Sequence, residues 1–284
     1  MIMNKFVVAL LSASLAVAAV AKAELLIKSG EKFVFLGDSI TQAGKSKPGG
    51  YVNLVDHALA ANGVKIEAIG AGISGHKSNQ MLARLEKDVL SKSPQWMTLS
   101  CGVNDVWHGA NGVSIEDYKK NITSIVEQAQ TANIKVILLT ATMIGEDQEN
   151  PNNQKLIPYN EFLRTLAKEK NCLLADLNAD MQDAVKKANT PGKNALTGDG
   201  VHMAFSGDAM MASSILKALG LDATAIAKAQ DAWLDLPNTT SLKVDAPFSQ
   251  REMLQFGKIA ADRNTTPQKI LDEEFKKLLE SLKK

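Results

Sequence analysis

The chain has 284 residues, 45% of them hydrophobic, and a formal net charge of +1 at pH 7. Its 32 Lys and Arg residues are balanced by 31 Asp and Glu residues, which argues against nucleic acid or an acidic polymer as a partner. The length suits one α/β domain with an appendage and is ample for a sizeable core.

The first 23 residues are typical of a signal peptide rather than of a folded element. Lys5 lies near the start, an apolar, alanine-rich run covers residues 6–20, and Ala21-Lys22-Ala23 has the small-x-small pattern that signal peptidases cleave. The run is too short for a comfortable membrane span, and no other stretch approaches the required length. We therefore expect an exported protein, periplasmic or extracellular, without a transmembrane segment in a mature chain that starts at Glu24. Loss of Lys5 and Lys22 changes the formal charge from +1 to −1.

The stretch around which the chain is organised is a predicted strand over residues 33–36 that leads into Gly37-Asp38-Ser39. Its four apolar residues, three of them aromatic or β-branched, indicate a fully buried strand. Open α/β sheets bind ligands at the carboxyl ends of their strands, so a hydroxyl placed there is a candidate nucleophile held in a fixed position. The simpler interpretation is an ordinary strand-to-helix turn in which Asp38 or Ser39 caps the next helix.

Beyond this strand, apolar β-rich segments alternate with segments that have helical spacing. Strands are predicted over residues 65–69, 95–100, 135–140 and 172–177, and helices over residues 51–61, 77–90, 114–131, 160–170 and 206–219. Such repetition is typical of a parallel sheet with helices on both faces. Right-handed crossovers then bring the carboxyl ends of all the strands to one edge.

Three further segments at that edge carry groups that can take part in a reaction. The second strand is followed by the glycine-rich residues 70–76, where a backbone N–H can approach a ligand closely. The third strand is followed by Asn104, which has a side-chain NH₂ donor. Between the fifth strand and the last helix of the repeat, Asp199 precedes His202 by three residues. Each segment alone is a common turn or cap, but together with Ser39 they supply a nucleophile, a base, an orienting acid and oxyanion donors.

At these four segments the chain resembles the SGNH, or GDSL, hydrolase superfamily of esterases and lipases. The resemblance covers residues 33–220, and its motifs follow the family's order: Gly37-Asp38-Ser39, Ile73-Ser74-Gly75, Gly102-Val103-Asn104-Asp105 and Asp199-Gly200-Val201-His202. The first motif is not the G-x-S-x-G of α/β-hydrolases. The resemblance implies a flavodoxin-like three-layer α/β/α sandwich around a five-stranded parallel sheet.

The resemblance also implies a role for each matching residue. Ser39 is the expected nucleophile, His202 the general base, and Asp199 the residue that orients the imidazole. The backbone N–H groups of Ser39 and Gly75 and the side chain of Asn104 are the expected oxyanion donors. The implied reaction is acyl transfer through a covalent ester, which requires no metal and no cofactor.

Four further residues near these motifs have a functional and a structural interpretation. His76, Trp107 and His108 lie beside the second and third motifs and are candidates for substrate contact. A Trp in that place stacks against a sugar ring or is a buried structural residue. His57 falls inside the first predicted helix, and we expect it to be a packed or surface residue rather than a catalytic one.

Asp38 and Asp105 are expected to orient loops and caps rather than to take part in chemistry. Cys101 and Cys172 fall at opposite ends of two non-adjacent predicted strands, so we expect them to be unpaired and buried. The chain has no CxxC or HExxH motif and no His-rich tract, so no metal site is predicted.

Two polar segments, residues 44–50 and 143–158, are predicted to be loops that extend from the catalytic edge. Neither has the long apolar run expected of a lipase lid, which favours a polar substrate such as an O-acetylated carbohydrate. The leading hypothesis is an exported serine esterase that deacetylates small molecules or oligosaccharides. The alternatives are a lipase, lysophospholipase or thioesterase of the same fold, and a non-catalytic carbohydrate-binding protein, which the intact motifs disfavour.

After Gly220 the resemblance ends, so we expect a hydrolase domain at residues 24–220 and a helical extension at residues 221–284. Helices are predicted over residues 222–235, from Ser249 and from Pro267, with a linker over residues 236–248. The last helix has an apolar stripe that must be buried. It is expected to pack on the sandwich, to pair with the preceding helix, or to contact a partner or a second copy of the chain. The simplest interpretation is an appendage without a catalytic role.

Overall fold

The computed structural model describes residues 25–190, 193–237, 239 and 247–282, so the predicted signal peptide lies outside the described residues. The chain divides into two compact units, Met1–Thr240 and Ser241–Lys284. The first unit carries all of the candidate site residues named above.

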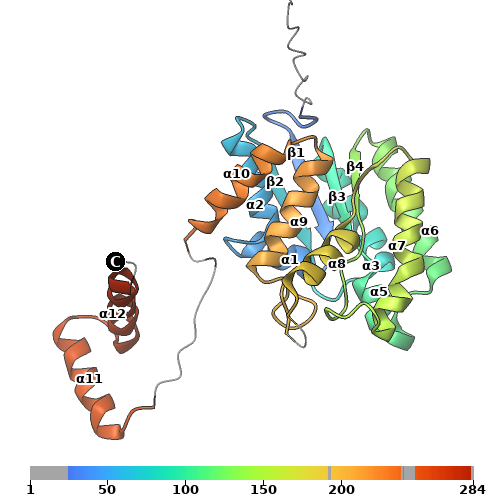
Figure 1. Ribbon diagram of the computed structural model, residues 1–284. Coiled ribbons are helices and arrows are strands. Elements are labelled where there is room, and N and C mark those ends of the chain that lie inside the picture. The colour runs from blue at the N-terminus through green and yellow to red at the C-terminus, as the bar shows by residue number, and fades with distance from the viewer. Residues whose placement is uncertain (1–24, 191–192, 238, 240–246, 283–284) are drawn as a thin grey trace, which may run out of the picture. The chain divides into compact units, whose positions relative to one another are not determined.

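A parallel sheet lies at the centre of the first unit, with the strand order β2-β1-β3-β4-β5 (Figure 1). Its five strands are β1 (Lys32–Gly37), β2 (Glu67–Gly72), β3 (Trp96–Ser100), β4 (Lys135–Leu139) and β5 (Leu173–Ala175). In the pairing register, Leu36 on β1 is opposite Ala71 on β2 and Leu99 on β3. The five-stranded parallel sheet predicted from the sequence is confirmed.

The apolar run of β1 follows from its place in the sheet. The strand lies between β2 and β3, and the side chains from Phe33 to Leu36 are all buried. Because helices cover both faces of a parallel sheet, side chains on either face of a central strand enter the core. A continuous hydrophobic run is therefore favoured over an alternating one.

Helices form a layer on each face of the sheet, which confirms the three-layer sandwich (Figure 1). One layer consists of α1 (Ser39–Ser46), α2 (Tyr51–Ala61), α8 (Leu177–Ala188), α9 (Phe205–Ala218) and α10 (Ala223–Leu234). The other contains α3 (Ser78–Ala83), α6 (Ile115–Thr131) and α7 (Pro151–Glu169). Short helices complete the unit: α4 (Leu85–Asp88), η1 (Leu90–Lys92), α5 (Val103–Trp107) and η2 (Gly109–Asn111).

Two predicted elements differ from the structure. Helix α7 begins at Pro151, whereas residues 143–158 were predicted to form a loop. The side chain of Asn150 caps this helix by accepting from the N–H of Asn152 at 2.8 Å, and proline is favoured at a first helical position. The helix predicted over residues 77–90 is divided into α3 and α4 at Arg84, whose guanidinium donates to the carbonyl of Gly37 at 2.7 Å. Helices α1, α5 and α8 were not predicted.

The predicted helical extension is divided between the two units. Helix α10 packs on α2 and α9 of the first unit, where Trp233 is only 2% exposed. The first compact unit therefore continues to Thr240, twenty residues beyond the boundary expected at Gly220. The difference arises because burial of Trp233 adds α10 to the core of the sandwich.

The second unit consists of α11 (Gln250–Asp262) and α12 (Pro267–Leu282), which pack against each other. A capping box at Ser249 and Glu252 starts α11, as the spacing predicted. Of the members of the apolar stripe, Ile270 is buried, and the others, such as Leu278 and Leu282, are exposed within this chain. A single neighbouring helix covers only a narrow part of an amphipathic face.

Candidate active site

Ser39 is the first residue of α1 and follows the carboxyl end of β1. The carboxylate of Asp38 caps this helix by accepting from the N–H of Ile40 at 2.9 Å. Of the two residues that could cap this helix, Asp38 is therefore the one that does so. The hydroxyl of Ser39 is left free for a different contact.

That contact is with His202, from a loop 163 residues further along the chain. Nε2 of His202 lies 2.9 Å from Oγ of Ser39, and Nδ1 lies 2.7 Å from Oδ2 of Asp199. The other oxygen of Asp199 accepts from the backbone N–H groups of Val201 and His202, at 3.0 and 2.7 Å. The structure thus brings the serine, histidine and aspartate predicted from the sequence into one hydrogen-bonded chain.

The contacts of Asp199 determine which nitrogen of His202 carries a proton when the imidazole is neutral. Burial raises the pKa of the carboxyl, but the hydrogen bonds from the side chain and backbone of His202 and from Val201 outweigh it and lower the pKa to about 2. An ionised Asp199 only accepts hydrogen bonds, so Nδ1 of His202 carries the proton and Nε2 accepts from the hydroxyl of Ser39. This is the tautomer that a general base needs.

The predicted oxyanion donors come from the strands on either side of β1. Gly75 follows β2 with a φ of +74°, a backbone conformation that favours glycine, and Asn104 lies in α5 after β3. The side-chain amide of Asn104 donates to Oδ2 of Asp38 and to the carbonyl of His76, both at 3.2 Å. The strand order therefore places Gly75 and Asn104 on the two flanks of Ser39.

Arg84 joins the ends of β1 and β2 beneath the candidate site and was not recognised from the sequence. Its guanidinium is buried and donates to the carbonyls of Gly37 and Ala71, at 2.7 and 2.8 Å. It also forms a 2.7 Å ion pair with Asp88, one turn further along the chain. An Arg within a segment of helical spacing is typical of a solvent-exposed helix face, so nothing in the local sequence indicated that Arg84 is buried.

The residues proposed for substrate contact have different environments. His76 is half-buried, and burial and the charge of Arg84 lower its pKa. Trp107 is 45% exposed, with its ring centroid 6.5 Å from that of the exposed His108. Among the described residues, neither Trp107 nor His108 forms a hydrogen bond with Ser39 or His202. His57 is exposed on α2, in agreement with its interpretation as a surface residue.

Asp38 and Asp105 are both buried and organise the backbone around the candidate site. Burial raises the pKa of Asp38 to about 6 and raises that of Asp105 above its usual value. Asp105 accepts from the N–H of Ser78 at 3.0 Å, which fixes the start of α3. Both cysteines are unpaired, as predicted, but only Cys101 is buried, whereas Cys172 is half-buried before the short strand β5.

Neither a metal centre nor a membrane span is found in the part of the chain that the structure describes. No three or more His, Cys, Asp or Glu side chains in the described residues gather so as to hold a metal ion. Within those same residues, no helix has both the length and the apolar character needed to cross a membrane.

Residues 35–209 match the sequence model of the GDSL-like Lipase/Acylhydrolase family. An acetylxylan esterase from Geobacillus stearothermophilus is 29% identical to this chain over 215 residues, which are 69% of this chain and 97% of the relative. The uncharacterized lipoprotein YqeF of Bacillus subtilis is 28% identical over 125 residues, which are 41% of this chain and 50% of the relative.

Solved structures of acetylxylan esterases are also similar. The acetyl xylan esterase AlAXEase superposes with a TM-score of 0.63 at 38% identity and covers 66% of this chain and 98% of its own. Axe2, the acetylxylan esterase from Geobacillus stearothermophilus, superposes with a TM-score of 0.63 at 30% identity and covers 69% of this chain and 97% of its own. Structures described as catalytic mutants of Axe2 carry Ala in place of a Ser, an Asp and a His.

Proposed function

The chain belongs to the GDSL-like lipase/acylhydrolase family and is a carboxylic ester hydrolase, and from this premise we propose that it is an exported serine esterase that deacetylates O-acetylated carbohydrates. The observation that carries the mechanism is the hydrogen-bonded chain from Ser39 through His202 to Asp199. A serine hydroxyl is a weak nucleophile on its own, and a neighbouring imidazole that accepts its proton activates it.

In the proposed reaction, Oγ of Ser39 forms a bond to the acetyl carbon while Nε2 of His202 takes the hydroxyl proton. The backbone N–H groups of Ser39 and Gly75 and the side-chain amide of Asn104 stabilise the negative charge that develops on the carbonyl oxygen. The bond to the sugar oxygen then breaks, and His202 donates the proton to the leaving alcohol. Water, deprotonated by His202, next attacks the acetyl-serine, and acetate leaves as Oγ regains its proton.

Throughout this cycle Asp199 holds the imidazole in the required tautomer and stabilises it when it is positively charged. The pKa of about 2 means that this carboxylate is ionised across the pH range in which an imidazole titrates. The catalytic mutants of Axe2 support these assignments. The residues replaced in them are a Ser, an Asp and a His, the same three residue types that are proposed here.

The substrate class is proposed from the relatives and from the candidate site. The acetylxylan esterases AlAXEase and Axe2 match about two thirds of this chain and nearly all of their own length. Residues 44–50 and 143–158 are largely polar and contain no long apolar run of the kind that covers a channel for long acyl chains. The exposed Trp107 offers a flat apolar face of the kind that stacks on sugar rings.

Export to the periplasm or the extracellular space is proposed from residues 1–23 and is consistent with the similarity to the lipoprotein YqeF. The expected processing site lies between Ala23 and Glu24. N-terminal sequencing of the protein secreted by an expressing host tests this part of the proposal, and a mature chain that retains residues 1–23 would contradict it.

The activity is tested by acetate release from O-acetylated xylo-oligosaccharides, with Ser39→Ala as the matched control. The wild type is expected to release acetate and to be labelled at Ser39 by an organophosphonate. The variant should do neither, while its near-UV circular dichroism is unchanged because only a hydroxyl is removed. Acetate release by folded Ser39→Ala within about tenfold of wild type would exclude Ser39 as the nucleophile.

A further inference from the structure

Two segments that are distant in the sequence meet beside the candidate site. One is the 140–150 segment, between β4 and α7, and the other is the 195–204 loop, which carries Asp199 and His202. We infer that Glu146 is a positioning residue for the esterase reaction, because it fixes the 195–204 loop so that His202 meets Ser39. The inference rests on the proposed Ser-His-Asp mechanism.

The contact consists of four hydrogen bonds to one carboxylate. Oε2 of Glu146 accepts from the N–H of Ala195 at 2.6 Å. Oε1 accepts from the N–H groups of Leu196 and Thr197, at 2.9 and 2.7 Å, and from Oγ1 of Thr197 at 2.6 Å. Three consecutive backbone N–H groups therefore point at a single anionic side chain, a geometry typical of a backbone anion nest.

These bonds occupy Glu146 completely enough to argue against direct contact with substrate. Burial raises the pKa of the carboxyl, but the bonds from Thr197 and the three backbone N–H groups outweigh it, so that the pKa is lowered and the group is ionised at neutral pH. A carboxylate has about four lone-pair positions, and the four hydrogen bonds from the protein match that number, with three on Oε1 and one on Oε2. Charge-assisted hydrogen bonds of this kind are about twice as strong as neutral ones.

The 195–204 loop is hydrogen-bonded within itself and buries the side chains of Leu196, Val201 and Met203, but it does not bury its two proposed catalytic side chains. Thr197 pairs with Met203 in an antiparallel bridge, and the N–H of Gly198 donates to the carbonyl of His202 at 2.9 Å. The side chains of Asp199 and His202 are 57% and 37% exposed, so surrounding side chains do not enclose them. Their position relative to Ser39 therefore depends on what holds the backbone of the loop.

A second contact strengthens the same junction. The N–H of Gly145 donates to the carbonyl of Gly200 at 2.7 Å, one residue after Asp199. Both glycines have positive φ, +76° and +94°, and a Cβ added to Gly200 would lie 3.5 Å from Cα of Gly145. The 140–150 segment thus contacts the 195–204 loop before and after Asp199.

The 140–150 segment is itself firmly attached to the sandwich. The side-chain amide of Asn153 donates to the carbonyls of Gly145 and Asp147, at 3.0 and 2.7 Å, on either side of Glu146. Its oxygen accepts from the N–H of Ile144 at 2.7 Å. The buried side chain of Asn153 thus ties the backbone on both sides of Glu146 to helix α7.

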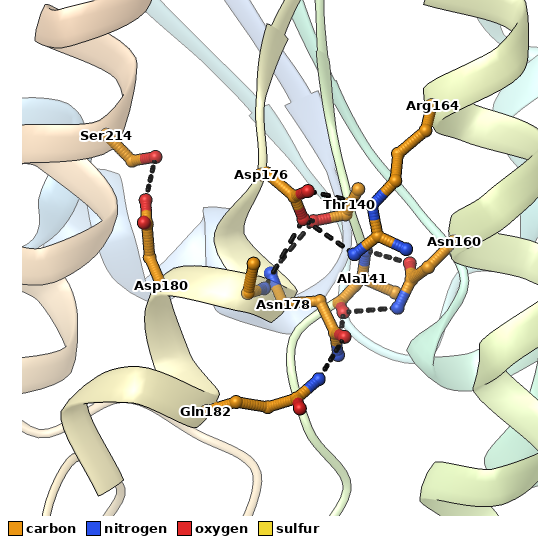
Figure 2. Close-up of polar contacts among 10 residues, drawn as sticks. Thr140, Ala141, Asn160, Arg164, Asp176, Asn178, Asp180, Gln182 and Ser214 are labelled. Carbon is orange, nitrogen blue, oxygen red and sulfur yellow. Dashed lines mark hydrogen bonds and ion pairs between the residues drawn. The ribbon is translucent and has the colours of Figure 1, made fainter. Parts of the chain in front are cut away.

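The start of the segment is fixed by the cluster of polar side chains in Figure 2. Asn160 of α7 pairs with both the N–H and the carbonyl of Ala141, at 2.8 and 3.1 Å. Arg164 donates two hydrogen bonds to Asp176, at 2.7 and 2.8 Å, and Thr140 donates to the same carboxylate at 2.9 Å. Glu146 therefore links the 195–204 loop to a segment that contacts with β4, β5 and α7 hold in place.

The test compares Glu146→Ala and Glu146→Gln with Asp147→Ala. Glu146→Ala removes four hydrogen bonds, and Glu146→Gln retains an acceptor oxygen but turns an NH₂ group toward a donor. Asp147 is the matched control because its carboxylate accepts only from the N–H of Glu149 within its own segment, among the contacts of the described residues. For acetyl ester hydrolysis we expect kcat of Glu146→Ala to fall about 10- to 100-fold, the effect of a misplacement of about 1 Å. KM should change less than about twofold, Glu146→Gln should be intermediate, and Asp147→Ala should match wild type.

A second pair of variants keeps the test decisive if Glu146→Ala does not fold. Thr197→Val removes the hydroxyl that donates to Glu146 and accepts from the N–H of Gly200 at 3.1 Å, and Thr197→Ser retains both contacts. We expect Thr197→Val to lower kcat and Thr197→Ser to restore it, at a temperature where near-UV circular dichroism shows each variant to be folded. The inference is overturned if folded Glu146→Gln and Thr197→Val keep the wild-type kcat, or if only KM rises. Failure of the proposed mechanism itself gives a different result, namely that Ser39→Ala remains active.

Discussion

The side-chain amide of Asn104 donates to the carboxylate of Asp38 at 3.2 Å, between the ends of two adjacent strands. Asp38 also caps the helix that begins with Ser39. One buried carboxylate thus orients both the segment of the proposed nucleophile and the proposed side-chain oxyanion donor. Asp38 has the orienting role that the sequence predicted, and the hydrogen bonds identify which groups it orients.

The first prediction concerns Asn104→Ala. Loss of one oxyanion donor should lower kcat for acetyl esters by about 10² to 10³, with a much smaller change in KM, because the donor acts on charge that is present only in the transition state. Steady-state kinetics of the folded variant measure both constants. A higher KM with an unchanged kcat would make Asn104 a substrate-binding residue instead.

The second prediction concerns the pH dependence of kcat/KM. The reaction requires a neutral imidazole at His202, so activity should fall on the acid side of the profile. Burial raises the pKa of Asp38 to about 6, so protonation of this carboxyl is the alternative origin of such an acid limb. Asp38→Asn therefore serves as the control and should keep the acid limb of the profile, whereas His202→Ala should abolish activity. Disappearance of the limb in Asp38→Asn would assign it to Asp38.

The third prediction concerns acyl-chain length. Each additional buried methylene contributes about 0.8 kcal/mol only where an apolar channel receives it. Because residues 44–50 and 143–158 are largely polar and contain no long apolar run, kcat/KM across p-nitrophenyl esters should be highest for acetate and should drop by butyrate. A preference for octanoate or longer chains would favour a lipase of the same fold.

The fourth prediction concerns stability and Asp208, a buried carboxyl that accepts from the N–H of Tyr51 at 2.9 Å. Burial raises its pKa from 3.8 to about 7, so between about pH 4 and 7 the folded state retains a proton that the unfolded state releases. The free energy of unfolding should therefore fall as the pH rises through this window. Asp208→Asn should remove this dependence and be more stable than wild type at pH 8, by about 2 to 4 kcal/mol. Urea unfolding at pH 5 and pH 8 measures the difference, and parallel pH dependences would contradict it.

The sheet and the residues around Ser39 were predictable because their signals are local. A central parallel strand is apolar on both faces, and the motifs at the strand ends are short and follow a fixed order. The start of α7 at Pro151 had a local signal as well, since Asn150 and Pro151 are typical of a helix start. The polar composition of the segment favoured a loop, and that interpretation was wrong.

Glu146 and Arg84 could not have been predicted in the same way. The partners of Glu146 lie 49 to 51 residues away, and Arg84, besides its ion pair with Asp88, binds backbone carbonyls 13 and 47 residues away. A charged side chain that binds backbone groups leaves no pattern in the residues that it binds. Such contacts are specified by the tertiary fold, and only a structure reveals them.

The separation of 163 residues between Ser39 and His202 determines when the proposed site can be assembled during synthesis. A chain that ends at β4 already holds the serine and the segments of all three proposed oxyanion donors, but it lacks His202, the proposed general base. The 195–204 loop follows all five strands in the sequence. The proposed site is therefore incomplete in any chain truncated before His202, even where every strand of the sheet is present.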